Sequence, residues 1–143
     1  MSVKQISVFL ENKPGQLAEL TKVISDSKIN LRALSLAEAE DFGVARLIVD
    51  DVYNASTTLK EKGFISSTRD VLAISISDEP GSFSKVLKIL GDNGINLEYM
   101  YSFTTKIVTN ANMVLKVNDE KKAKEILIAN GVKTISQDEL AKL

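Results

Sequence analysis

The stretch PGQLAELTKVISDSKINL, residues 14–31, recurs 66 residues later as PGSFSKVLKILGDNGINL, residues 80–97. Seven of the eighteen aligned positions are identical, whereas about one identity is expected by chance. The similarity continues at an offset of 68 beyond a two-residue insertion between Thr104 and Asn110, so that Leu47 aligns with Leu115. The sequence is therefore an internal duplication, and we predict two modules, residues 1–70 and residues 71–143.

Each copy predicts the same succession of strands and helices. Apolar residues alternate at Ile6, Val8 and Leu10, which is the pattern of a half-buried strand, and the alternation returns at 72–76. After each Pro-Gly pair, apolar residues recur at spacings of three and four, as on one face of a helix. A hairpin of two strands, a second helix and a short last strand follow. We place these strands at 31–38, 42–49 and 64–68 in the first copy, and at 97–104, 113–117 and 132–136 in the second.

The ends of the predicted helices carry residues that start and stop helices. Asp50-Asp51 and Asn118-Asp119 supply N-cap residues for the second helix of each copy, and a glycine follows each of these helices. Gly94 suits a left-handed residue after the other helix, whereas Lys28 at the matching position would be strained. The predicted fold class is α+β: two tandem ferredoxin-like βαββαβ modules, each with an antiparallel sheet and both helices on one face.

The composition excludes several classes of function. Histidine and cysteine are both absent, which removes imidazole- and thiolate-based nucleophiles, the usual zinc and haem sites, and disulfides. The lysines and carboxylates show no paired general acid and base, so we expect no enzyme, no cofactor and no metal. The net charge of -1 argues against a nucleic-acid partner. Because the apolar runs are short and the N-terminus lacks an apolar leader, we expect a cytoplasmic protein without a membrane partner.

The junction between the first strand and the first helix is the most informative functional feature of each copy. Asn12-Lys13-Pro14-Gly15-Gln16 matches Asp78-Glu79-Pro80-Gly81-Ser82. Glycine lets another group approach the backbone closely, and a helix N-terminus offers unpaired N–H groups and about half a positive charge. An anionic small molecule is a natural occupant of such a junction. The alternative is that Pro-Gly only builds the turn that starts the helix.

The pattern of a strand, (Asn/Asp)-x-Pro-Gly-x-(Leu/Phe), a helix and Ile-Asn-Leu resembles the ACT domain, and it occurs twice over almost the whole chain. The resemblance implies ferredoxin-like modules that bind amino acids or similar metabolites and regulate enzymes. The tandem arrangement is similar to that of free-standing ACT proteins without a catalytic domain. In that family the ligand usually lies between two modules, and a homodimer with a possible further protein partner is expected.

The resemblance also implies which residues form the ligand site. Carried over by position, the first element consists of Asn12, Lys13, Pro14, Gly15, Gln16, Leu17, Asn30 and Leu31, and the second of Asp78, Glu79, Pro80, Gly81, Ser82, Phe83, Asn96 and Leu97. The two loops differ, since Glu79 replaces Lys13 and Ser82 replaces Gln16. Lys13 would attract an anion and Glu79 would repel one, so stronger binding is expected at the first element.

Several of these residues allow a purely structural interpretation. Leu17, Leu31, Phe83 and Leu97 fit core spacing, and Asn30 and Asn96 fit a turn because asparagine accepts left-handed backbone. Alternation along the strand at 97–104 predicts one face shared by Leu97, Tyr99, Tyr101 and Phe103, which serves the core, a ligand or an interface.

The same topology is compatible with two other functions, RNA binding and protein binding. RNA-recognition modules stack bases on aromatic residues of their central strands, but the strands at 44–49 and 112–117 contain none. A scaffold that binds another protein through its sheet surfaces, without a metabolite, is the stronger rival to a metabolite-binding regulatory protein.

Overall fold

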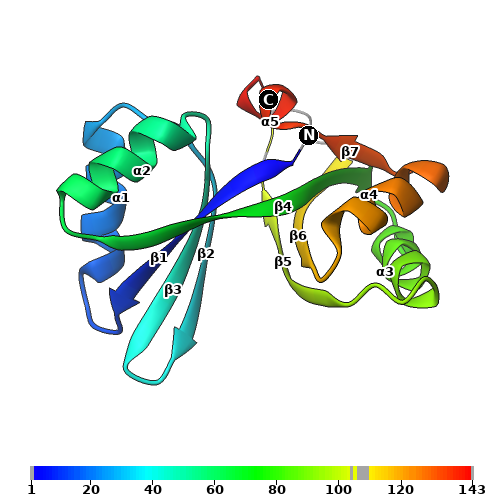
Figure 1. The fold of residues 1–143 in the computed structure, drawn as a ribbon, viewed down its shortest axis with the longest axis horizontal. Coiled ribbons are helices and arrows are strands. Elements are labelled where there is room, and N and C mark those ends of the chain that lie inside the picture. Colours follow the sequence, from blue (N-terminus) through cyan, green and yellow to red (C-terminus); the bar gives the residue numbers. More distant parts are fainter. Residues whose placement is uncertain (1, 104, 106–109, 143) are drawn as a thin grey trace. The chain divides into compact units, whose positions relative to one another are not determined.

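A computed structural model describes residues 2–103, 105 and 110–142 of the chain (Figure 1). The chain divides into two compact units. One is Lys4–Arg69, and the other joins the start of the chain, up to Val3, to Asp70 and the residues after it. The predicted strand end at Thr104 and most of the predicted insertion, at 106–109, lie outside the described residues. Within the described residues, no helix is long and apolar enough to cross a membrane.

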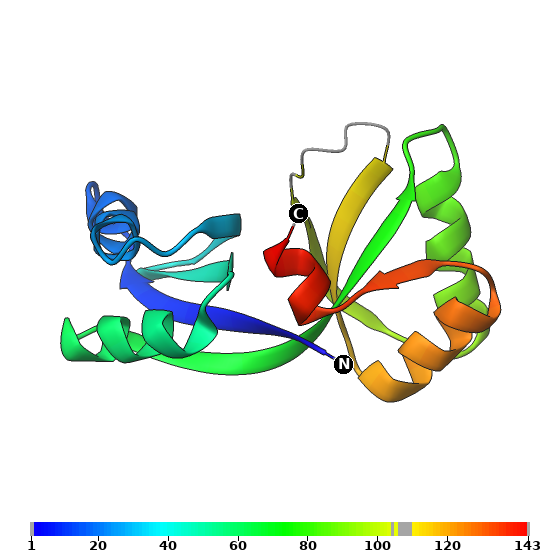
Figure 2. The same ribbon diagram turned by 90° about the horizontal axis from the view of Figure 1, so that it is seen from above.

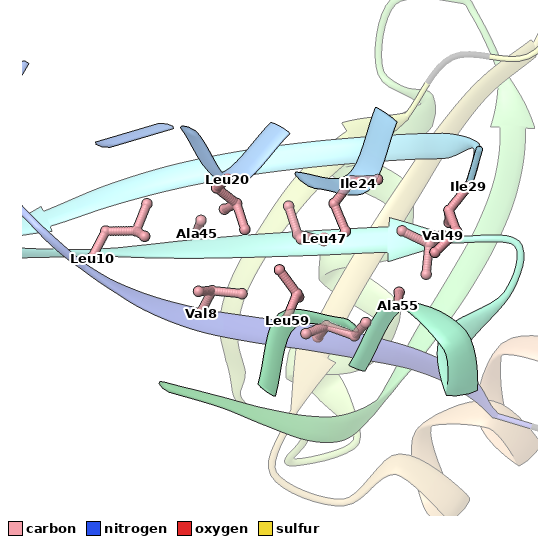
Figure 3. Packing of buried hydrophobic residues seen from close by; sticks show 11 residues of the cluster. Val8, Leu10, Leu20, Ile24, Ile29, Ala45, Leu47, Val49, Ala55 and Leu59 are labelled. Atoms are coloured by element: carbon pink, nitrogen blue, oxygen red, sulfur yellow. The ribbon is translucent and has the colours of Figure 1, made fainter. Parts of the chain in front are cut away.

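The first unit has the predicted βαββαβ order. Its elements are β1 (Val3–Glu11), α1 (Gln16–Asp26), β2 (Leu31–Ala39), β3 (Phe42–Val49), α2 (Val52–Glu61) and the first part of β4 (Ile65–Ser77). The strand order is β2-β3-β1-β4, with Ile6 opposite Leu47 in the antiparallel pair of β1 and β3. Both helices cover the same face of this sheet, where α1 and α2 place apolar side chains against β1 and β3 (Figure 3).

The second unit repeats this arrangement. It continues β4 with α3 (Ser82–Asp92), β5 (Leu97–Phe103), β6 (Asn110–Val117), α4 (Glu120–Ala129), β7 (Lys133–Ile135) and α5 (Gln137–Ala141). The strand order is β5-β6-β4-β7, and Leu72 of β4 lies opposite Leu115 of β6. Helices α3 and α4 lie together on one face of the strands (Figure 2). The core between them contains Leu72, Ile74, Val86, Leu90, Ile95, Leu115, Val117, Ala123 and Leu127. The predicted fold class is confirmed in both units.

Two of the predicted strands are joined in the structure. The predicted last strand of the first copy, 64–68, and the predicted first strand of the second copy form one continuous strand, Ile65–Ser77. The residues between them, Arg69, Asp70 and Val71, include neither glycine nor proline, so nothing in the local sequence breaks the extended backbone.

Helix α5 was not predicted from the sequence. Its N-cap Ser136 accepts a hydrogen bond from the Glu139 backbone N–H, and the Glu139 side chain accepts one from the Ser136 backbone N–H. This capping box is a recognisable Ser-x-x-Glu signal. The helix buries Leu140 completely.

The predicted helix ends are confirmed. Asp51 and Asp119 are the N-caps of α2 and α4, and each carboxylate accepts a bond from the backbone N–H three residues later. Lys28 and Gly94 are both left-handed, with φ of 58° and 72°. The left-handed interpretation of Asn30 and Asn96 was wrong, because Lys28 and Glu40 are the described non-glycine residues with positive φ.

The prediction that Leu97 shares one face of β5 with Tyr99 and Tyr101 is also wrong. The register between β5 and β6 shifts between Leu97 and Tyr99, so Leu97 pairs with Val117 and Tyr99 with Lys116. Leu97 packs against the core on the helix side. Beyond this bulge, Tyr99 and Tyr101 lie on the opposite face of the sheet.

Candidate functional site

The turn before α3 exposes the start of that helix. Gly81 is the N-cap residue, with φ of 86°, and no side chain caps the helix. The first bond that closes the helix runs from the Lys85 N–H to the Gly81 carbonyl oxygen, over 3.0 Å. Of the amides before it, that of Ser82 donates to the Glu79 carbonyl oxygen over 3.2 Å, and those of Phe83 and Ser84 contribute to the partial positive charge of the helix N-terminus. A Cβ atom at Gly81 would meet no described atom within 4 Å, apart from its neighbours in the chain. Glycine is therefore favoured here by the positive φ, and the space beside its backbone is open.

A cavity of about 540 Å³ opens at this helix start, entirely within the second unit. We call it the Gly81 cavity, and it is bordered by the end of β4, the Pro-Gly turn, one side of α3, and the segment between α4 and β7. Its lining residues are Ser75, Ile76, Ser77, Glu79, Pro80, Gly81, Ser82, Lys85, Val86, Ile89, Asn130, Gly131, Val132 and Lys133. The size suits a small metabolite.

The polar groups of the Gly81 cavity carry both signs of charge. The hydroxyl oxygens of Ser77 and Ser82 lie 2.8 Å apart and share one hydrogen bond. Lys85 and Glu79 form no ion pair with the described residues, and Lys133 lies 3.9 Å from Glu139. Two ammonium groups and one carboxylate therefore line the cavity beside the positive helix end. This arrangement can bind a carboxylate and, at Glu79, a cationic group.

The matching turn before α1 has the same backbone but different partners. Gly15 has φ of 87°, and the Glu19 N–H bonds to its carbonyl oxygen over 3.0 Å. The Lys13 ammonium group lies 3.0 Å from the Glu11 carboxylate, so its charge is already matched. Asn12 is tied to the turn between β2 and β3, because its side-chain amide donates to the Glu40 carbonyl oxygen over 3.1 Å.

The predicted asparagines lie at the other end of each first helix. The Asn30 backbone N–H donates to the Asp50 side chain over 3.2 Å, and the Asn96 N–H donates to the Asn118 side chain over 2.9 Å. These bonds join the start of β2 or β5 to the end of the following strand. Asn30 and Leu31 line a separate cavity of about 520 Å³ beside the end of α1.

Within one module, the structure does not bring the two halves of the predicted site together. Helix α3 has eleven residues, which corresponds to about 16 Å between the Gly81 turn and the Asn96 end. The Gly81 cavity includes Glu79, Pro80, Gly81 and Ser82 from the predicted set, but neither Asn96 nor Leu97. Leu17 and Phe83 are partly buried and pack against the cores of their units.

Sequence reasoning missed ten of the fourteen cavity residues, which come from the end of β4, from α3 and from the segment 130–133. Lys85 lies in the first turn of α3, and its counterpart in the first module is Glu19. That reversal of charge was visible in the aligned copies. The segment 130–133 lies about fifty residues further along the chain, and only the packing of α4 against α3 brings it to the cavity.

Two of the repeated identities have a local explanation. Lys22 and Lys88 each donate a hydrogen bond to the aspartate four residues later, Asp26 and Asp92, over 2.7 and 2.8 Å. These hydrogen bonds, with the negative charge of the aspartates, raise the pKa of Lys22 and Lys88 above the ordinary lysine value. Both pairs are exposed and bridge successive turns of a helix, so they need no ligand to account for them.

Comparisons with known proteins agree with this architecture. The model of a family described as ACT domain pair matches residues 1–143. The crystal structure of protein BT0572 from Bacteroides thetaiotaomicron is 41% identical in sequence, with a TM-score of 0.93 over 100% of this chain and 98% of that chain. No curated protein matches the sequence.

More distant solved structures share the fold. The ligand-free regulatory subunit of aspartate kinase from Thermus thermophilus is 17% identical, with a TM-score of 0.68 over 90% of this chain and 89% of that chain. The corresponding subunit from Thermus flavus is 15% identical, with a TM-score of 0.66 over 90% of each chain.

Proposed function

The chain belongs to the ACT domain pair family, and from this premise we propose that it is a non-catalytic regulatory protein of the cytoplasm that binds an amino acid. The single observation that carries the proposal is the Gly81 cavity at the uncapped start of α3. The names of two neighbours of the same fold, regulatory subunits of aspartate kinase, support a regulatory role.

The cavity offers a partner for each part of a free amino acid. The α-carboxylate faces the amides at the start of α3 and the Lys85 ammonium group, which favour negative charge. The α-ammonium group faces the Glu79 carboxylate. The predicted residues of the first module, from Asn12 to Leu17, and the four at Asn30, Leu31, Asn96 and Leu97 remain candidates for secondary contacts.

A thermal-shift screen of the full chain against the twenty amino acids tests this function. A ligand at 100 times its Kd stabilises the folded state by about 2.7 kcal/mol, which raises the Tm of a chain of this size on the order of 10 °C. We expect one or a few related amino acids to give such a shift. If none of the twenty raises the Tm, the chain is no amino-acid sensor.

A protein-binding scaffold is the second candidate, and one observation favours it. Phe9 of β1 and Phe42 of β3 lie on the sheet face opposite α1 and α2, with ring centroids 6.5 Å apart, and each residue is 46% exposed. Exposed aromatic pairs of this kind are common in protein interfaces. The edge strand β2 also exposes Leu34 and Leu36, which supports a homodimer. A scaffold of this kind would show no Tm shift with any amino acid.

A further inference from the structure

The edge strand of the first sheet has a palindromic sequence. Strand β2 comes first in the strand order, so its outer edge has no neighbouring strand among the described residues. Its centre, Ala33-Leu34-Ser35-Leu36-Ala37, reads the same in both directions about Ser35, and Arg32 and Glu38 flank it with opposite charges. Two such strands that pair antiparallel about Ser35 place identical residue types opposite each other in the centre and opposite charges at both ends.

The hydrogen bonds of the sheet decide which backbone groups of β2 face this open edge. The Asn12 N–H donates to the Asp41 carbonyl oxygen over 3.1 Å. Because bonding alternates along a strand, the odd-numbered residues of β3 bond to β1, and its even-numbered residues bond to β2. Arg46 is one of the latter, and it pairs with Ser35. The backbone of Ser35 therefore bonds to β3, whereas the N–H and C=O groups of its two leucine neighbours face the open edge.

The side chains of β2 suit the same pairing. Leu34 and Leu36 pair with Leu47 and Ala45, which belong to the core, so both leucines lie on the helix side of the sheet. They are nevertheless 36% and 54% exposed. In the antiparallel pair, the leucines of the two chains form one apolar cluster. The other face of the strand carries only alanine and serine from residue 33 to residue 39, so no bulky side chain obstructs the approach of a second strand.

The edge strand β5 of the second unit lacks these features. At the repeat offset of 66, Met100-Tyr101-Ser102 replaces the central Leu-Ser-Leu of β2, so β5 is not palindromic. Glu98 stands at the position of Arg32, and its carboxylate already lies 3.2 Å from the Lys116 ammonium group. Of these two edge strands, β2 alone is complementary to itself.

We propose that β2 binds β2 of a second copy of this chain, antiparallel and centred on Ser35, so that the first sheets of two chains form one continuous sheet. Leu34 exchanges backbone hydrogen bonds with Leu36 of the partner subunit, and Arg32 lies opposite Glu38 of the partner subunit. A centre at either leucine would instead place a charged residue opposite a leucine. This interface belongs to the expected homodimer and does not depend on an amino-acid ligand.

Disulfide cross-linking of the full chain tests the register, because the protein has no cysteine of its own. Ser35 lies opposite its own copy in a pair without mutual hydrogen bonds, where the Cα atoms are about 4.5 Å apart, a distance that suits a disulfide. We expect Ser35→Cys to form a covalent dimer under mild oxidation, seen on a non-reducing gel.

Ala37→Cys is the matched control for the register. It lies on the same face of β2 as Ser35, but residue 37 of one chain lies opposite residue 33 of the other. The two introduced thiols would therefore be separated by four residues, or about 13 Å along the strands, and no cross-link is expected. A covalent dimer of Ala37→Cys, or none of Ser35→Cys, would overturn the proposed register.

Sedimentation equilibrium of the full chain measures the association itself. Leu36→Pro removes an N–H that faces the open edge and leaves the bonds between β2 and β3 in place. We expect this variant to fold, as checked by circular dichroism, and to raise the Kd of the dimer about tenfold or more. A native chain that stays monomeric, or an unchanged Kd in folded Leu36→Pro, would contradict the interface.

A charge exchange decides the matter if Leu36→Pro does not fold. Arg32→Glu places carboxylates opposite each other at both ends of the paired strands and should weaken the dimer. Adding Glu38→Arg to the same chain restores opposite charges and should recover most of the affinity. A double variant that dimerises no better than Arg32→Glu would show that these residues do not face each other. Each of these results leaves the proposed amino-acid binding to be judged by its own Tm screen.

Discussion

At the scale of single residues, Gly15, Gly81, Lys28 and Gly94 show how far the sequence predicts backbone conformation. Pro-Gly before a helix predicted the two turns, and both glycines have positive φ. The strain predicted for Lys28 is also present, with φ of 58°. The partners of Asn30 and Asn96 could not be predicted, because the side chains of Asp50 and Asn118 lie 20 and 22 residues away along the chain.

Replacement of Lys28 by glycine should stabilise the protein. A left-handed non-glycine residue costs about 1–2 kcal/mol, which glycine would remove. Glycine is also freer in the unfolded chain, and this greater freedom lowers the free energy of unfolding by roughly 0.5–1 kcal/mol. We expect Lys28→Gly to raise the free energy of unfolding by roughly 0.5–1 kcal/mol, measured by urea denaturation. The matched control is Gly94→Lys, which should lower it by a similar amount. A destabilised Lys28→Gly variant would show that the Lys28 side chain makes a contact that offsets the strain.

At the scale of helices and strands, the hydrophobic periodicity and the cap residues predicted most of the fold. The alternation of Ile6, Val8 and Leu10 and the spacing within 14–31 placed β1 and α1 correctly. The continuous strand β4 was not predicted, because a strand pattern does not show that two adjacent strands share one axis. The bulge in β5 was not predicted either, since it depends on the register with β6.

The caps of α2 and α4 should contribute equally to stability. The Asp51 carboxylate accepts a bond from the Asn54 N–H, and the Asp119 carboxylate accepts one from the Lys122 N–H, each over 3.1 Å. We expect Asp51→Ala and Asp119→Ala each to lower the free energy of unfolding by about 1 kcal/mol, measured by chemical denaturation. Glu120→Ala is the matched control, because this neighbouring carboxylate is no N-cap. A loss in the control as large as that in Asp119→Ala would assign the effect to charge rather than to capping.

At the scale of the whole molecule, the internal duplication predicted two modules of the same fold. The lining of the Gly81 cavity, in contrast, depends on packing between segments that lie far apart in the sequence. The Pro-Gly turn supplied Glu79 to Ser82 of the candidate site, but the segment 130–133 reaches it only through the packing of α4 beside α3. The alignment of the copies contained the exchange of Glu19 for Lys85. Its meaning depends on knowing that Lys85 lines a cavity, which one sequence does not reveal.

We expect residues 1–70 expressed alone to fold poorly or to self-associate. The fragment would end in the middle of β4, which continues to Ser77 without a loop, and would leave an unprotected strand end. The fragment would also lack the residues after Asp70 with which Val3 groups, and Val3 is only 1% exposed in the full chain. Circular dichroism and analytical ultracentrifugation of the fragment beside the full chain provide the measurement. A monomeric fragment with a sharp unfolding transition would show that the module at 1–70 is an independent domain.

The measurement that tests amino-acid binding most directly compares one ligand with and without its carboxylate charge. Isothermal titration calorimetry of the full chain would use the amino acid that gives the largest Tm shift and the carboxamide of the same amino acid. Because the start of α3 and Lys85 stabilise a negative charge, the carboxamide should bind about tenfold more weakly or not at all. Equal affinity for the two forms would contradict the account, since the carboxylate would then lie outside the Gly81 cavity.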